Sequence, residues 1–280
     1  MKLLVGYDGS NGARDALKLA RVVAEAAGAG VVVVTVLPCG PLPVPYALLD
    51  EEKEEWAEPL FAEAKEHLGE LEVETLAFGG GTPAGVINDL AEREGFASIV
   101  VGSPHRGAVG RTLIGSVANG LLHGAPCEVI VAPRDYASED DWPFRTIAVA
   151  YDDTPEAKAA LGRAEEIALA CRSKIVIYTT SMPPVFAAGA GRYVPTMFPD
   201  AGSIVTGAVK AVDERLGATG RVLDGAPGPA IAAACEEAGA DLLVAGSRGY
   251  GPAMRVMLGS VSTQLAHQAP CPLLVVPRPF

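Results

Sequence analysis

An internal repeat is the feature that most constrains how this chain folds. Residues of the same type recur 144 positions apart along the 280-residue sequence, including Asp8 and Asp152, Pro83 and Pro227, Gly102 and Gly246, and Arg134 and Arg278. The tripeptide Ala-Pro-Cys likewise occurs at 125–127 and again at 269–271. Two copies of this length are each large enough to bury a hydrophobic core. We therefore predict two domains, 1–135 and 144–280, joined by the polar, acidic linker Asp135–Pro143.

Within each copy, short apolar runs that predict strands alternate with longer stretches that predict helices. In the first copy we expect strands at Leu3–Tyr7, Val31–Leu37, Leu71–Ala77, Ser98–Val101 and Val129–Ala132, and helices at Asn11–Ala27, Ala47–Leu68, Pro83–Glu94 and Val117–His123. This alternation predicts an α/β fold in which each domain is a doubly wound parallel sheet flanked by helices. The second copy differs most at Pro183–Gly202, which is either a lid or a surface excursion, followed by a helix predicted at Ser203–Leu216.

Composition argues against several classes of protein. A net charge of −12 disfavours nucleic acids and acidic membrane surfaces as partners. No apolar run approaches the roughly 20 residues that span a bilayer, and the N-terminus leads into a strand and not a signal peptide. Five scattered cysteines form no Cys-x-x-Cys pair, which fits reduced thiols in the cytoplasm and predicts no metal site.

A glycine-rich loop follows the fourth predicted strand in both copies. In the second copy the strand Leu242–Ala245 leads into a loop from Gly246 to Ser260, and a helix is predicted at Val261–His267. Glycines let backbone N–H groups approach an anion, and the start of a helix adds a partial positive charge, so this loop predicts a phosphate site. It contains no Walker lysine, and its glycine spacing is not that of the dinucleotide fingerprint. Turn formation alone is the alternative reading.

Three parts of each copy are expected to meet at the carboxyl edge of the sheet. Asp8 and Asp152 end the first strand, where a carboxylate can accept hydrogen bonds from a ribose or an adenine, or simply stabilise the turn. The residue two positions later can cap the next helix, which would leave the carboxylate free. Val36 and Thr180 end the second strand and either present their backbone to a base or belong to a plain core strand. The remaining candidates lie in the loops and at the helix starts: Gly102, His105, Arg111, Gly115, Ser116 and Val117 in the first copy, and Gly246, Arg248, Gly249, Arg255, Gly259, Ser260 and Val261 in the second.

The pattern Gly246-x2-Gly249-x9-Gly259-Ser260 resembles the nucleotide loop of the universal stress protein family. Asp152 and the segment 269–272 (Ala-Pro-Cys-Pro) are also similar to that family, and the resemblance covers both copies. It implies a five-stranded sheet of order 3-2-1-4-5 in each domain, and pairing of domains through their last strands. It further implies that ATP binds, with or without Mg²⁺. In the family pattern the aspartate contacts adenine and ribose, while the loop glycines and the serine hold the phosphates.

The first copy departs from this pattern at His105, which stands at the position of Gly249. Pro104 precedes it and removes one backbone donor, and a side chain at this position hinders close approach of a ligand. Alternatively, His105 itself contacts a phosphate. Arg111 and Arg255 match between the copies and either supply charge to the site or are solvated. We therefore expect the second site to bind ATP more tightly than the first.

Three hypotheses about function follow from these residues. The leading one is a cytoplasmic ATP-binding stress-response or signalling protein, a nucleotide-dependent sensor or regulator that also forms homodimers. The second is a slow ATPase or nucleotidyl-transfer enzyme. The sequence argues against this hypothesis, because it shows no Walker lysine and no acidic pair placed for magnesium. The third is a structural module whose domains pair and whose loops bind nothing. We assign no catalytic residue.

The negative charge also generates a prediction about nucleic acids. Phosphate backbones are held by clustered Lys and Arg, and the net charge of −12 opposes this electrostatic attraction. We expect no meaningful binding to DNA or RNA in a gel-shift titration. A salt-dependent shift at micromolar protein would contradict the prediction.

Overall fold

The computed structural model describes residues 2–37, 50–103, 115–138, 144–181, 200–247 and 258–277. The first half has strands β1 (Lys2–Gly6), β2 (Gly30–Leu37), β3 (Val73–Gly79), β4 (Ser98–Gly102) and β5 (Glu128–Ala132), and helices α1 (Asn11–Ala27), α2 (Asp50–Leu68), α3 (Pro83–Glu94) and α4 (Ser116–Leu122). The second half has strands β6 (Thr146–Ala150), β7 (Lys174–Ser181), β8 (Thr219–Asp224), β9 (Leu242–Gly246) and β10 (Leu273–Val276), and helices α5 (Pro155–Cys171), α6 (Ala201–Ala211), α7 (Pro227–Ala238) and α8 (Ser260–Gln268). The predicted α/β alternation is therefore confirmed.

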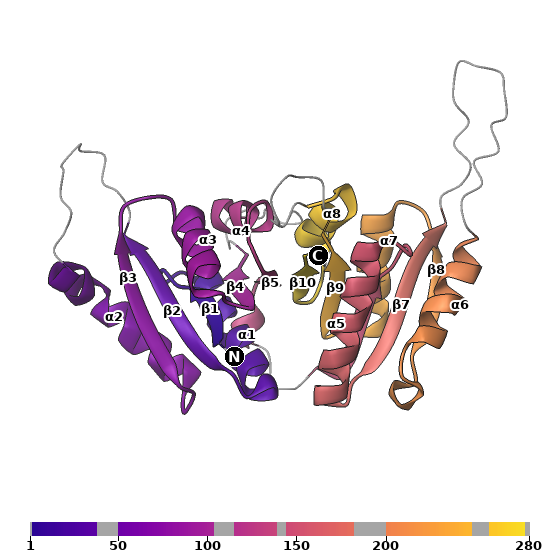
Figure 1. Cartoon of the computed structure of the whole chain (residues 1–280), viewed down its shortest axis with the longest axis horizontal. Coiled ribbons are helices and arrows are strands. Elements are labelled where there is room, and N and C mark those ends of the chain that lie inside the picture. Colours follow the sequence, from indigo (N-terminus) through magenta and orange to yellow (C-terminus); the bar gives the residue numbers. More distant parts are fainter. Residues whose placement is uncertain are drawn as a thin grey trace, which may run out of the picture.

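The described strands form one ten-stranded sheet of order β3-β2-β1-β4-β5-β10-β9-β6-β7-β8. Within each half the strands run parallel in the order 3-2-1-4-5 that the resemblance implied. The expectation of a separate sheet in each domain is corrected by β5 and β10, which pair antiparallel with Leu274 opposite Ile130. Figure 1 shows these two last strands at the centre of the molecule, with β3 and β8 towards its ends. The predicted pairing of the halves is thus confirmed, whereas homodimerisation of the chain stays a prediction.

The hydrophobic core forms two layers, one on each face of the sheet, and each layer runs through both halves. The layer beneath α1, α2, α5 and α6 contains both Leu17 and Leu161. The layer beneath α3, α4, α7 and α8 contains both Leu121 and Leu265. Successive strand residues point to opposite faces, so Ile130 of β5 enters the first layer while its neighbours enter the second. The central strands, such as β1, β4 and β9, are nearly continuous apolar runs, as expected of strands that are covered on both faces.

Polar contacts reinforce the junction between the halves. Glu128 at the start of β5 accepts a hydrogen bond from Arg163 of α5, with 2.8 Å between Oε1 and Nε. Its other oxygen accepts from the Ser98 hydroxyl at 2.8 Å. The predicted linker begins as a short 3-10 helix, Tyr136–Ser138, because the buried Asp15 carboxylate accepts from two backbone N–H groups of this segment. The two halves are therefore held by side chains as well as by strand pairing.

Two predicted elements differ from the described structure by two residues or more at their ends. The helix expected at Ser203–Leu216 is wrong at its end, since α6 stops at Ala211 and a 3-10 turn follows at Glu214–Leu216. The reason is Asp213, whose carboxylate accepts from the backbone N–H of Arg215 and so starts a new turn. The strand expected at Leu71–Ala77 lies two residues later, because β3 pairs with β2 as far as Gly79. Most of Pro183–Gly202 lies outside the described residues.

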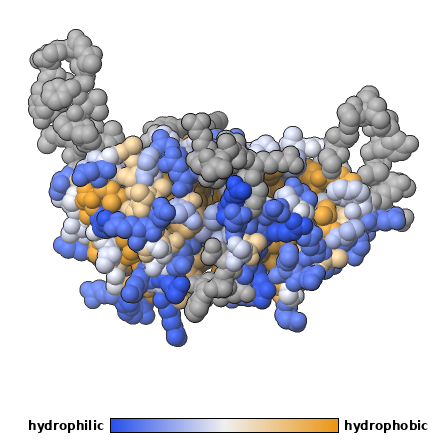
Figure 2. Space-filling model, turned by 180° about the vertical axis from the view of Figure 1, so that it is seen from behind, coloured by the Kyte–Doolittle hydropathy of each residue, from blue (hydrophilic) through white to orange (hydrophobic). Residues whose placement is uncertain are grey.

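The surface of the described part is mixed in character. Figure 2 shows hydrophilic and hydrophobic residues interspersed on the face seen from behind. The large hydrophobic side chains that remain exposed include Trp56, Leu169 and Val222. None of the described helices combines the length and the apolar character that a bilayer crossing requires.

We predict that the two halves stay associated after the chain is cut between them. A protease site inserted within 139–143 leaves β5 paired with β10, where Ile130 and Leu274 are buried. Exposing an aliphatic side chain of this size costs about 1.5–3 kcal/mol. The cut halves should therefore elute together in size-exclusion chromatography and unfold in one transition. Two separate soluble halves, each as stable as the intact chain, would contradict this.

Candidate functional site

In each half, one buried threonine joins the ends of the first two strands. Thr35 Oγ1 donates to the backbone carbonyl of Tyr7 at 2.8 Å, and Thr179 Oγ1 donates to that of Tyr151 at 2.9 Å. The candidate binding residues follow directly after these hydrogen-bonded residues. Asp8 is therefore brought to the same edge of the sheet as Val36, and Asp152 to the same edge as Thr180. These threonines are positioning residues that the loop and aspartate motifs do not include. Their signal is a hydroxyl in an apolar strand, repeated in both copies.

Both aspartates are partly occupied by the turn that follows them, which corrects the expectation that capping by the residue two positions later leaves them free. Ser10 Oγ and Thr154 Oγ1 do cap α1 and α5. Asp8 Oδ1, however, accepts from the Ser10 N–H at 3.0 Å, and Asp152 Oδ1 accepts from the Thr154 N–H and hydroxyl at 3.3 and 2.6 Å. Within the described residues, Oδ2 of neither carboxylate has a hydrogen-bond donor, and both side chains are exposed.

The glycine that ends the fourth strand of each half lies against the first turn of a helix. A Cβ added to Gly102 would lie 1.7 Å from the carbonyl oxygen of Gly12 in α1. A Cβ added to Gly246 would lie 2.6 Å from the carbonyl oxygen of Glu156 in α5. Close approach of two backbones therefore requires glycine here, whatever the loop binds. The same contact brings the end of this strand to the aspartate loop.

A second helix reaches Gly246 from the other side. Ser262 in the first turn of α8 donates its hydroxyl to the Gly246 carbonyl at 2.9 Å. Gly259 is the N-cap of α8 and has no side chain to accept from the first-turn N–H groups, while its φ of −74° suits any residue. The amino ends of α5 and α8 thus converge on one strand end. Each helix start carries a partial positive charge, which favours an anion, and the start of α8 has no side-chain cap.

The corresponding helix in the first half is shorter and lacks this tie. α4 spans seven residues against nine for α8, and it begins after Gly115, whose φ is −64°. Ala118 stands at the position of Ser262, so no hydroxyl is available for the Gly102 carbonyl. The start of α4 is therefore held less firmly than the start of α8.

The loop after the first strand also differs between the halves. Asp153 adopts a φ of 64° and accepts from the Tyr151 hydroxyl at 3.1 Å, with Lys158 Nζ at 3.0 Å. Lys158 and then Tyr151 lower the pKa of Asp153, while burial, followed by Asp153, raises the pKa of Tyr151 to about 12. Gly9 occupies the matching position in the first half, with a φ of 75°. The second site therefore has a lysine close to its aspartate loop, which sequence reasoning missed.

The structure describes only part of the predicted set. Ser116 and Ser260 are exposed in the first turns of α4 and α8, next to the half-buried Val117 and Val261. The loop residues His105, Arg111, Arg248, Gly249 and Arg255 lie outside the described residues. Within the described ranges, no three His, Cys, Asp or Glu side chains gather as metal ligands do. Four described cysteines are free thiols: Cys127, Cys171, Cys235 and Cys271.

Taken together, the fold defines a protein of two doubly wound α/β domains in tandem, each presenting an aspartate loop, a strand-end glycine and a helix start at the carboxyl edge of its sheet. The model of the universal stress protein family matches residues 1–133 and 143–277. The chain belongs to this family and carries two of its domains, as the sequence pattern predicted.

Individual relatives span the chain in the same way. A universal stress protein of Mycobacterium tuberculosis is 29% identical over 303 residues, which cover 99% of this chain and 100% of that protein. A universal stress protein of Thermus aquaticus is 33% identical over 146 residues, covering 48% of this chain and 98% of that protein. A crystal structure of a universal stress protein from Archaeoglobus fulgidus matches 99% of this chain and 98% of that chain, with 24% identity and a TM-score of 0.78. This last similarity shows the shared fold.

The close packing of the strand-end glycines predicts a graded loss of stability on substitution. Gly102→Ala should lower the free energy of unfolding by about 3 kcal/mol or more, and Gly246→Ala by about 1–3 kcal/mol. The loss is larger at Gly102 because the Cβ added there lies nearer to a backbone oxygen. Gly162→Ala is the matched control, since its Cβ meets nothing within 4 Å in the exposed interior of α5. The control should gain about 0.5–1 kcal/mol in urea denaturation. Equal effects of all three substitutions would contradict the packing role.

Proposed function

We propose that this protein binds an adenine nucleotide, ATP, and that it acts as a nucleotide-dependent sensor or regulator. The observation that carries the proposal is the convergence of the amino ends of α5 and α8 on Gly246, beside Asp152. Two partial positive charges at one strand end suit a polyphosphate, and a carboxylate with an unused oxygen suits a ribose or an adenine amine. Membership of the universal stress protein family supports this pairing of groups.

The nucleotide is oriented across the edge of the sheet in this proposal. Its phosphates lie against the first-turn N–H groups of α8, with the glycines of Gly246-x2-Gly249-x9-Gly259-Ser260 allowing close approach. Its adenosine lies towards Asp152 Oδ2 and the end of β7 at Thr180. Lys158, now paired with the exposed Asp153, can turn to a phosphate at little loss, because exposed ion pairs contribute little. Mg²⁺, if bound, is held through the phosphates.

The second half is the tighter site in this proposal. Its helix α8 is longer than α4 of the first half. Ser262 also hydrogen-bonds the start of α8 to the strand end, whereas the first half has Ala118 at this position. The first loop also carries Pro104 and His105 in place of a backbone donor and a glycine. Loss of one charge-assisted donor weakens binding by about 1.5–3 kcal/mol, roughly tenfold to a hundredfold.

A sensor is favoured over an enzyme because the sequence contains no Walker lysine and no acidic pair placed for catalytic magnesium. Steady-state ATP turnover by purified protein separates the two. A turnover that stays at background supports a sensor, and a sustained rate supports a slow ATPase. Nucleotide retained through purification without added ligand separates both from a module that binds nothing.

Calorimetric titration with ATP tests the site and the ranking. Gly259→Val places a β-branched side chain where phosphate must approach, and the extended backbone at Gly259 accepts valine without strain. We expect this substitution to abolish the tighter binding. Gly115→Val is the matched control, because Gly115 has nearly the same backbone conformation at the start of α4.

Both variants should stay folded, with similarly small losses of melting temperature, because valine is a poorer N-cap than glycine. If Gly115→Val removes the tighter binding while Gly259→Val leaves it intact, the two sites are ranked in the wrong order. If neither the wild type nor the variants bind ATP, the proposal fails.

A further inference from the structure

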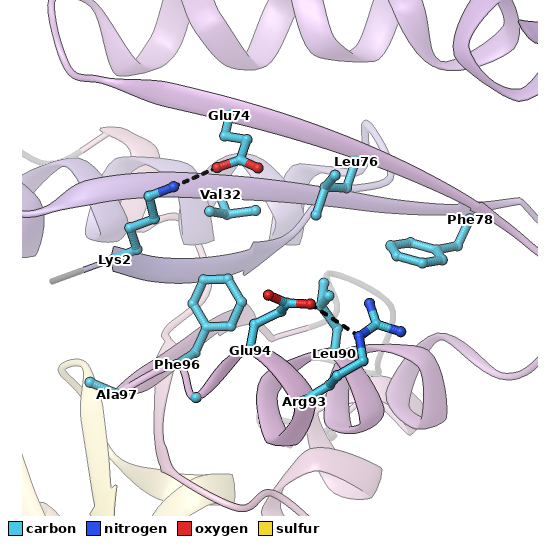
Figure 3. A pocket seen from close by; sticks show the side chains of 11 residues that line it. Lys2, Val32, Glu74, Leu76, Phe78, Leu90, Arg93, Glu94, Phe96 and Ala97 are labelled. Carbon is cyan, nitrogen blue, oxygen red and sulfur yellow. Dashed lines mark hydrogen bonds and ion pairs between the residues drawn. The ribbon is translucent and has the colours of Figure 1, made fainter. Parts of the chain in front are cut away.

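The first half contains a cavity that is separate from the candidate nucleotide site. It has a volume of about 490 Å³ and lies between β3 and the carboxyl end of α3. Leu76 and Phe78 line it from the strand, and Leu90 and Phe96 line it from the helix and the turn after it. Figure 3 shows the Phe78 ring on the strand side and the Phe96 ring on the helix side. The volume of this cavity lies within the range of sites that bind small organic molecules.

Charged side chains surround this apolar lining in two ion pairs. Lys2 Nζ lies 2.6 Å from Glu74 Oε2, and Arg93 Nε lies 3.1 Å from Glu94 Oε1. All four side chains are between 51% and 64% exposed. Ion pairs with this exposure contribute little to stability, because water screens them. Either carboxylate can therefore exchange its partner for a bound cation with little loss.

The equivalent region of the second half carries different side chains. Tyr178 stands where the first half has Val34, and its hydroxyl donates to a backbone carbonyl of α7 at 3.0 Å. Arg221 stands where the first half has Leu76, because Leu76 pairs with Val34 and Arg221 pairs with Tyr178. Both terminal nitrogens of Arg221 contact Glu237 of α7 at 3.2 Å. The second half therefore does not repeat the lining of this cavity.

The charges around the cavity favour a cation over an anion. Glu74 and, more weakly, Glu72 raise the pKa of Lys2. Lys2 and Arg93 balance Glu74 and Glu94 in the lining, so the nearby Glu72 leaves one carboxylate in excess. Figure 3 shows the Glu94 carboxylate between α3 and the strands, facing the cavity. The faces of phenyl rings attract cations, and the net charge of −12 draws cations towards the whole protein.

We propose that this cavity binds a small organic cation with an apolar body, an arylalkyl or alkyl ammonium ion. The ammonium group donates hydrogen bonds to the carboxylates of Glu74 and Glu94, and the apolar body contacts Phe78 and Phe96. Lys2 and Arg93 turn outwards to solvent when the ligand enters. The site belongs to the first half alone, so the two domains of this chain recognise different ligands.

Two probes of matched shape and opposite charge test the proposal on the full-length protein. 2-Phenylethylamine is the cation, and 3-phenylpropionate is the anion. We expect saturable binding of the amine in a calorimetric titration, with the carboxylate roughly tenfold weaker or worse, because only the amine gains charge-assisted hydrogen bonds. Equal or tighter binding of 3-phenylpropionate, or no saturation with either probe at millimolar concentration, would overturn the proposal.

Variants locate the binding within the cavity. E74Q/E94Q should weaken the amine at least tenfold, whereas E58Q/E66Q changes the net charge equally on the exposed face of α2 and should leave the affinity unchanged. L76R/R93E copies the Arg221–Glu237 bridge of the second half and should abolish binding while circular dichroism stays unchanged. Unaltered binding in E74Q/E94Q or in a folded L76R/R93E protein would refute the assignment. ATP titration should be the same for all variants, so failure here is distinguishable from failure of the nucleotide site.

Discussion

The antiparallel pairing of β5 with β10 is the interaction on which the rest of the structure depends. It turns two five-stranded sheets into one, so that each core layer is shared between the halves and neither last strand is an exposed edge. Glu128 adds an ion pair to Arg163 across the same junction. A domain of this kind carries its own apolar strand edge, and a tandem copy covers that edge within one chain. The duplication is therefore a physical solution to an unpaired edge as well as a doubling of sites.

The geometry of the candidate nucleotide site follows from close backbone packing at the strand ends. Glycine at 246 lets the first turn of α5 approach β9, and the Ser262 hydroxyl brings α8 to the same point. Thr179 holds the end of β7 against the residue before Asp152. Each of these contacts is short range and directional, so together they leave the helix ends little freedom. A site assembled in this way needs little reorganisation to hold an anion.

The two halves have kept one fold while their surfaces have diverged. Tyr178 and Arg221 contact α7 in the second half, where the first half has Val34 and Leu76. Ser262 hydrogen-bonds the start of α8 to Gly246, whereas Ala118 in α4 has no hydroxyl for the equivalent contact. In both cases only one or two side chains change on corresponding elements of the same fold. Tandem duplication permits this, because one half can preserve a site while the other acquires a new one.

The sequence by itself determined the number of domains, the strand–helix alternation and most helix starts. These depend on periodicity and on caps such as Ser10 and Thr154, which act within a few residues. It missed two local contacts: Asp152 uses one oxygen for its own turn, and Asp213 starts a new turn after α6. It also could not predict the cavity beneath Phe78, which exists only because β3 and α3 leave space between them. Sheet register, close backbone approach and cavities arise between residues far apart in the chain, and only the tertiary structure decided them.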